Sequence, residues 1–259
     1  MTAHTDADVL AVVERSPLAA ARHDRSGWVG LFTVDGRVED PVGSAPHRGH
    51  HEIGLFFDTF IAPRDITVCS VADIVCGVTV VRDVTLVVRM GTQVTMTIPA
   101  ILRYTVREVG NDIKIDELQA FWELPAMLGQ FARNGLRAVP VTVGLTRALL
   151  SNQGVGGALG FLRGLHRPAR RHHRQVEALV TALTGGDQLT ARRILHDGAG
   201  ITLGDQLPMT TDALGARLRG ARVVTRLTAG WSTAVSVRTD EGPGVLLIDT
   251  GDWMVRYYG

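Results

Sequence analysis

One short stretch of the chain has the residue types and spacing of a proton-transfer site. Asp40 directly follows a short strand-like run, residues 36–39, and is followed at once by Pro41. A proline disfavours the helical conformation of the residue before it, so Asp40 is predicted to be extended. Gly43 and Gly49 then mark a turn-rich loop. A single carboxylate at the mouth of an apolar pocket can take a proton from a carbon acid, which makes Asp40 a candidate general base. The alternative is a plain turn aspartate.

The residues around Asp40 predict the elements that must position it. Apolar spacing and β-branched runs predict helices over 8–23, 26–33 and 52–60 and strands over 36–39, 66–76, 78–90, 94–104 and 113–122. A group of helices followed by long strands is typical of an α+β fold, here a curved antiparallel sheet packed on helices. Such a cone leaves an open end between sheet and helices, where an apolar pocket is expected.

The second half of the chain repeats this order at smaller scale. The pattern predicts a helix over 176–195 interrupted at Gly185–Gly186, a strand over 201–203, a helix over 209–218 and strands over 222–229, 232–238, 244–249 and 253–258. Where the first copy has Asp40–Pro41, the second has Gly204–Asp205. We therefore predict tandem cone-shaped domains: a pocket-bearing domain (1–123), a basic amphipathic helical linker (124–173) and a degenerate second domain (174–259).

The middle segment differs from both halves. It has no acidic residue between Glu123 and Glu177, whereas arginines and apolar residues alternate along it. A basic amphipathic stretch can lie on an anionic membrane surface, so 124–174 is one candidate for such contact. The other interpretation is a linker whose short helices cover the sheet of the first domain with the arginines in water.

Composition limits the class of protein. The formal net charge is +1 and hydrophobic residues make up 45%, which argues against bulk affinity for nucleic acid and against disorder. No apolar run reaches the roughly 18–20 residues that span a bilayer, and the polar start 1–8 does not resemble a secretory signal. Cys69 and Cys76 lie in one strand-like run and are expected to stay reduced. We predict a cytoplasmic protein, with peripheral membrane contact left open.

The motifs around Asp40 resemble a known family. They are Val38–Pro41, Gly43, Pro46, Gly49, Ile53 and Phe56, followed much later by Leu102–Tyr104 and Gln119–Trp122. Over about residues 8–123 the chain resembles ketosteroid isomerase, a SnoaL-like member of the nuclear-transport-factor-2-like superfamily of α+β cones. This superfamily hosts many activities, so the resemblance implies the fold more directly than the chemistry.

The resemblance implies a role for Asp40 and a gap opposite it. In the isomerase an aspartate moves a proton beside a ketone, and a tyrosine with a protonated aspartate holds the resulting oxyanion. Asp40 stands at the position of the base. The tyrosine position falls on Ser16, the protonated aspartate near Ala100, and a supporting tyrosine on Phe57. We expect Tyr104 at the far end of its strand. Removing one oxyanion donor typically costs about 10²–10³ in rate, so a weak isomerase or a cone with another use is expected.

Three functions remain open at this stage. The first is proton-transfer isomerisation of a steroid or other hydrophobic polycyclic ketone. The second is non-catalytic lipid or sterol binding, and the third is epoxide opening with Asp73 as a second acid. The expected pocket residues are Ser16, Trp28, Phe32, Phe56, Phe57, Asp73, Leu86, Ala100 and Trp122. We expect no cofactor and no metal, since His47, His50 and His51 are expected to face water. A dimer or an intramolecular pairing of the two domains is also expected.

Overall fold

The computed structural model describes residues 4–90, 94–132, 170–195 and 199–259. The first half contains the following elements: α1 (Asp6–Ala21), α2 (Arg25–Gly30), β1 (Phe32–Glu39), β2 (His47–Arg48), α3 (Gly49–Phe56), a π-helical turn η1 (Phe57–Ile61), β3 (Asp65–Cys76), β4 (Thr79–Met90), β5 (Val94–Val109), β6 (Asp112–Phe121) and α4 (Leu124–Ala132). The second half contains α7 (Arg170–Gly185), α8 (Gln188–Leu195), β7 (Gly200–Leu203), β8 (Leu207–Pro208), α9 (Thr211–Leu218), β9 (Arg222–Ala229), β10 (Ser232–Thr239), β11 (Gly242–Asp249) and β12 (Met254–Tyr258).

The two halves have the same sheet topology. The first six-stranded sheet has the order β2-β1-β6-β5-β4-β3, and the second has β8-β7-β12-β11-β10-β9. The predicted α+β fold and the repeated order of elements are confirmed. The sheets, predicted to be antiparallel, each contain one parallel pair, because β1 runs parallel to β6 and β7 parallel to β12. In each copy the last strand returns between the first strand and the antiparallel meander, so both sheets are mixed.

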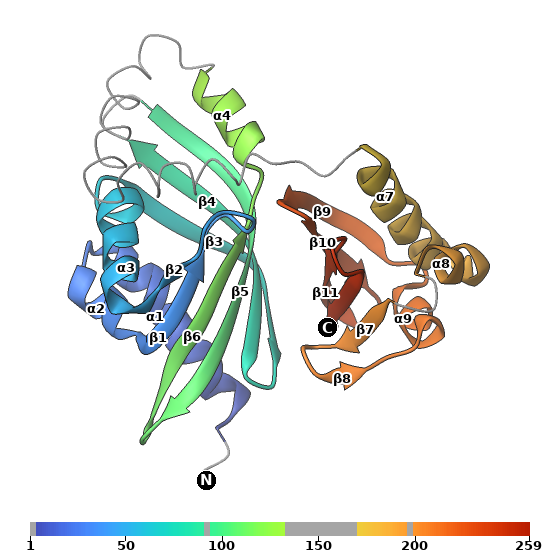
Figure 1. Ribbon diagram of the computed structural model, residues 1–259, viewed down its shortest axis with the longest axis horizontal. Coiled ribbons are helices and arrows are strands. Elements are labelled where there is room, and N and C mark those ends of the chain that lie inside the picture. The colour runs from blue at the N-terminus through green and yellow to red at the C-terminus, as the bar shows by residue number, and fades with distance from the viewer. Residues whose placement is uncertain (1–3, 91–93, 133–169, 196–198) are drawn as a thin grey trace.

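The four layers are helices, sheet, sheet and helices (Figure 1). In Figure 1, α1, α2 and α3 cover the left face of the first sheet, and α7, α8 and α9 lie on the far side of the second. The two sheets face each other across an apolar cluster that includes Val81, Ile101 and Phe121 from one and Leu247 and Tyr258 from the other. The predicted pairing of the two units within one chain is therefore present.

The strands of the first sheet direct alternate side chains to the helices on one face and to the second sheet on the other. Val80, Ala100, Leu102 and Tyr104 face the helices and belong to the larger core. Their immediate neighbours Val81 and Ile101 belong to the cluster between the sheets. Because successive residues of a strand point to opposite faces, each strand contributes both to the core around α1 and to the contact with the second unit.

Helix α1 brings a polar residue onto the sheet. Thr5 caps it reciprocally with Asp8: the Thr5 hydroxyl oxygen accepts from Asp8 N at 3.2 Å, and Thr5 N donates to Asp8 Oδ2 at 2.9 Å. Its buried face follows the helical repeat and consists of Val9, Val12, Val13, Ser16 and Ala20. Ser16 is therefore held inside the core, directly above the strands.

Several predicted boundaries shift for physical reasons. The helix expected over 26–33 ends at Gly30, because Phe32 already pairs with Ile115 in the parallel β1–β6 contact. The helix expected over 52–60 begins at Gly49 and changes to the π-helical turn at Phe57. The expected turn at 91–93 and most of the basic segment 124–174 lie outside the described residues. Among the described helices, none is long and apolar enough to cross a membrane.

Candidate active site

Asp40 lies immediately after β1, beside the end of β6. The Asp40–Pro41 peptide bond is cis, and Val42 N donates to Ala120 O at 2.9 Å. The indole Nε1 of Trp122 donates to Asp40 Oδ1 at 2.6 Å. Trp122 and Ala120 both belong to the helix-side core, so the carboxylate is directed into the interior of the first unit.

The environment makes Asp40 an unusually strong base for a carboxylate. Burial raises its pKa to about 6, and the hydrogen bond from Trp122 opposes part of that effect. At neutral pH the group is mostly ionised yet binds a proton far more readily than an ordinary aspartate. This combination suits a residue that must both accept and return a proton.

Glu39 points to the other side of the strand and braces the loop after Asp40. Its carboxylate accepts from Arg37 Nη2 at 2.7 Å, Gly43 N at 2.9 Å and Gln119 Nε2 at 3.2 Å. The second unit adds a backbone contact, because a Cβ built on Gly43 would lie 2.6 Å from the Cα of Gly230. The loop that carries Asp40 is thus fixed from within the first sheet and by the β9–β10 turn.

Tyr104 lies in the core of the first unit, which the sequence did not predict. It was expected at the far end of its strand, but it lies within β5, is buried, and has a pKa on which the Asp40 charge acts. Burial is the main cause that raises the pKa of Tyr104, while a hydrogen bond with Ser16 and the charge of Arg82 lower it. Trp28 Nε1, from α2, donates to Ser16 Oγ at 3.0 Å and so fixes the position of the Ser16 hydroxyl beside Tyr104.

Arg82 and Asp73 form an ion pair on the same inner face. They are directly opposite on β4 and β3, and Arg82 Nε and Nη2 donate to Asp73 Oδ1 and Oδ2 at 2.7 and 3.1 Å. Ser70 Oγ also donates to Asp73 Oδ1, at 3.0 Å. Arg82 was missed in the sequence because a single arginine in a β-branched run resembles a solvated residue.

The predicted pocket residues gather in one core. The Trp28 ring lies 4.9 Å from Phe32, 6.0 Å from Phe56 and 5.5 Å from Phe57, measured between centroids. Ala100 is buried with them, and Leu86 packs at the margin. Ser16, Asp40 and Trp122 join this group, whereas Asp73 on the edge strand β3 pairs with Arg82 on the neighbouring strand β4. Phe32 and Phe57 are fully buried and act as core residues.

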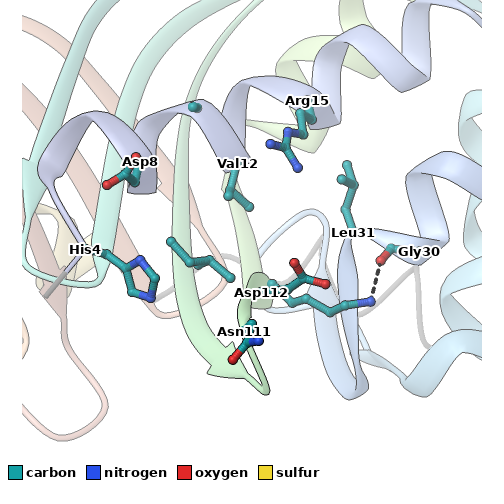
Figure 2. A pocket seen from close by; sticks show the side chains of 11 residues that line it. His4, Asp8, Val12, Arg15, Gly30, Leu31, Asn111 and Asp112 are labelled. Carbon is teal, nitrogen blue, oxygen red and sulfur yellow. Dashed lines mark hydrogen bonds between the residues drawn. The ribbon is translucent and has the colours of Figure 1, made fainter. Parts of the chain in front are cut away.

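A separate pocket of about 400 Å³ opens between the start of α1, the end of α2 and the β5–β6 turn. Figure 2 shows His4, Asp8 and Arg15 on one side and Asn111 and Asp112 on the other. Lys114 Nζ donates to Gly30 O at 3.0 Å at its edge. Its lining mixes both signs of charge and contains none of the predicted site residues.

Comparison with known proteins supports the fold of the first unit. Residues 9–109 match the family model of the nuclear transport factor 2 (NTF2) domain, which confirms the resemblance of the first unit at superfamily level. A search of curated proteins found no match.

Solved structures with similar folds each cover about half of this chain. A Δ5-3-ketosteroid isomerase from Mycobacterium sp. is 26% identical and covers 46% of this chain and 95% of its own, with a TM-score of 0.42. A Mycobacterium tuberculosis protein in complex with estradiol-17β-hemisuccinate is 24% identical, covers 46% and 95%, and has a TM-score of 0.42. An LEH-like epoxide hydrolase of M. tuberculosis is 16% identical, covers 52% and 97%, and has a TM-score of 0.43.

Proposed function

We propose that the first unit binds a hydrophobic, steroid-like ketone and transfers a proton on it, with Asp40 as the general base. The observation that carries this proposal is the buried Asp40 carboxylate, whose pKa is raised to about 6 while Trp122 fixes its orientation. A base with this pKa is basic enough to take a proton from a carbon beside a carbonyl and remains ionised at neutral pH. The aromatic core around Trp28 offers the apolar surroundings that such a ligand requires.

The test is isomerisation of a Δ5-3-ketosteroid by the full chain. Asp40→Asn should lower turnover by about 10²–10⁴-fold, as expected for the loss of a general base. The matched control is Asp35→Asn, which changes an exposed carboxylate on β1, the strand that leads to Asp40. Asp35 is paired with Arg107, and its substitution should leave turnover unchanged. Turnover by the wild type that survives in Asp40→Asn would contradict the proposed role.

A non-catalytic carrier of a sterol or lipid is the second candidate. Ala100, which stands near the position of the isomerase's protonated aspartate, is fully buried and carries no polar group. Steroid binding without turnover in the wild type would favour the carrier. The paired-acid alternative is less favoured, because both Asp73 oxygens accept hydrogen bonds from Arg82, which leaves that carboxylate poorly suited to donate a proton.

A further inference from the structure

Arg82 presents a buried donor that has no acceptor in the described part of the chain. Its side chain is 6% exposed, and among the described residues Nη1 has no hydrogen-bond partner. The other two guanidinium nitrogens hold Asp73 in a bidentate pair. A buried unsatisfied donor destabilises the protein, so an acceptor that reaches Nη1 would recover that free energy.

The guanidinium is held in place before any ligand arrives. Asp73 faces Arg82 directly across the β3–β4 ladder, and Ser70 holds Asp73 in turn. A planar fork fixed by a carboxylate on one side presents its remaining N–H in one direction. Arg82 is therefore preorganised, which favours binding of an acceptor over rearrangement of the protein.

Tyr104 lies beside Arg82 on the inner face. Arg82 is opposite Leu102 on β5, and Tyr104 is two residues further along that strand, which makes Arg82 and Tyr104 diagonal neighbours on one face. Ser16 accepts from Trp28 and can donate its own proton to Tyr104, which leaves the Tyr104 proton available to an acceptor. The Asp40 charge acts on the same phenol.

We propose that Arg82 Nη1 and the Tyr104 hydroxyl together bind the ligand oxygen, opposite Asp40. This inference rests on the proposed function. As the C–H bond beside the carbonyl breaks, its proton moves to Asp40 and the electron pair shifts to the carbonyl oxygen. The oxygen becomes an enolate that accepts from Arg82 and Tyr104. Asp40 then returns the proton to the conjugated carbon. The two donors replace those that the sequence lacks at Ser16 and Ala100.

The proposal also defines a ligand class. A site made of the Arg82 guanidinium and the Tyr104 hydroxyl favours a ligand oxygen that carries negative charge in the bound state. Ketones with acidic enols, and phenols that mimic an enolate, should bind more tightly than alcohols of the same shape.

The experiment uses a fluorescent polycyclic phenol as the probe and the full-length chain. The fraction of bound phenol that is ionised is read from its spectrum between pH 5 and 9, and the dissociation constant is measured on the same samples. The ionisable groups around the site are Glu14 from α1, Asp73, Arg82, Tyr104 and Asp40. Wild type should bind the phenolate preferentially.

Tyr104→Phe and Arg82→Lys should each lower the bound phenolate-to-phenol ratio by about tenfold, the effect of one hydrogen bond of ordinary strength. In isomerisation both should lower kcat, with little change in KM for the neutral ketone. Arg89→Lys, an exposed arginine on the same strand, is the matched control and should change nothing. Thermal melting checks that Arg82→Lys folds, and Tyr104→Phe removes only one oxygen.

The outcomes separate this inference from the proposed function. An unchanged phenolate ratio in both variants, with binding retained, overturns the Arg82–Tyr104 site and leaves Asp40 as the base. If the polycyclic phenol does not bind, small naphthols are titrated at high concentration. Naphtholate binding that depends on Arg82 and Tyr104 supports the oxygen site and rejects the steroid class, whereas no dependence rejects both.

Discussion

Asp40 and Asp205 occupy equivalent places in the two repeats and have opposite environments. Asp40 is two residues beyond Val38, which pairs with β2, and Asp205 is two residues beyond Leu203, which pairs with β8. Asp40 faces the helix-side core, and Trp122 donates to it. Asp205 faces the first sheet, where Arg103 Nη2 and Tyr258 Oη donate to its Oδ1 at 2.7 Å each and Thr79 donates to its Oδ2.

The pKa values follow the surroundings. Burial raises the pKa of both carboxyls, and for Asp40 that effect prevails. For Asp205 the charge of Arg103 and the hydrogen bonds from Thr79, Tyr258 and Arg103 outweigh burial and lower the pKa. The same topological position thus yields a carboxyl group with a raised pKa in one unit and one with a lowered pKa in the other. The first carboxylate faces the core of its own unit, whereas the second joins the two sheets.

The largest expected effect is on the contact between the sheets. Asp205→Ala removes one of the two carboxylates that pair with the buried Arg103 guanidinium, Glu117 being the other, and takes the acceptor from Tyr258 and Thr79. It should destabilise the chain by about 3 kcal/mol. The folded pKa of Asp205 is below its unfolded value, so its stabilisation is present above about pH 4 and is lost as pH falls further. Urea unfolding at pH 7 and pH 3 measures the difference. An equal loss at both pH values would contradict the ion-pair explanation.

Gly230→Ala tests whether the second unit supports the Asp40 loop. The new Cβ would lie 2.8 Å from the Cα of Gly43, and backbone cannot move aside as a side chain can. We expect a loss of about 2–3 kcal/mol, from this clash and from the positive φ of Gly230. Gly220→Ala is the control, since it also has positive φ but meets nothing within 4 Å. A Gly230 effect no larger than that of Gly220 would show that the loop is independent of the second unit.

The smallest expected effect has the opposite sign. Asp40→Asn should stabilise the chain by about 1–3 kcal/mol at pH 7, because the native state no longer holds a buried carboxylate. The folded pKa of Asp40 is above its unfolded value, so the wild type loses stability as pH rises from about 4 to 6. The gain in Asp40→Asn should therefore vanish near pH 4. Thermal melting at both pH values is the measurement, and a mutant less stable than wild type at pH 7 would contradict the burial of a charged group.

The sequence contained enough to predict the repeat and to single out Asp40 as a candidate. Strand and helix periodicity is local, so the order of elements follows from it, and Asp40–Pro41 is a local motif. The parallel pairing of β1 with β6 was missed, since it joins segments about eighty residues apart and leaves no local pattern. Tyr104 was misplaced for the same reason. Its direction depends on the register with Val80 and Leu118, which only the assembled sheet fixes.

The contact between Arg103 and Asp205 could not be predicted from the sequence either. The two residues lie in different repeats and meet only because the sheets face each other. Both are charged residues in strand-like or turn-like surroundings, which normally indicates exposure to water. The partners that bury them become visible only with the sheets assembled.

The adjacent residues Arg103 and Tyr104 give strand β5 a particular sensitivity to register. Arg103 reaches the second sheet, while Tyr104 faces the helices and Asp40. A slip of one residue against β4 or β6 would exchange them, placing a guanidinium in the apolar core and a phenol opposite Asp205. Misaligned β5 would thus lose both the buried Tyr104 hydroxyl and the Arg103–Asp205 contact between the units in one step. Contacts in both halves of the molecule therefore favour the same register of β5.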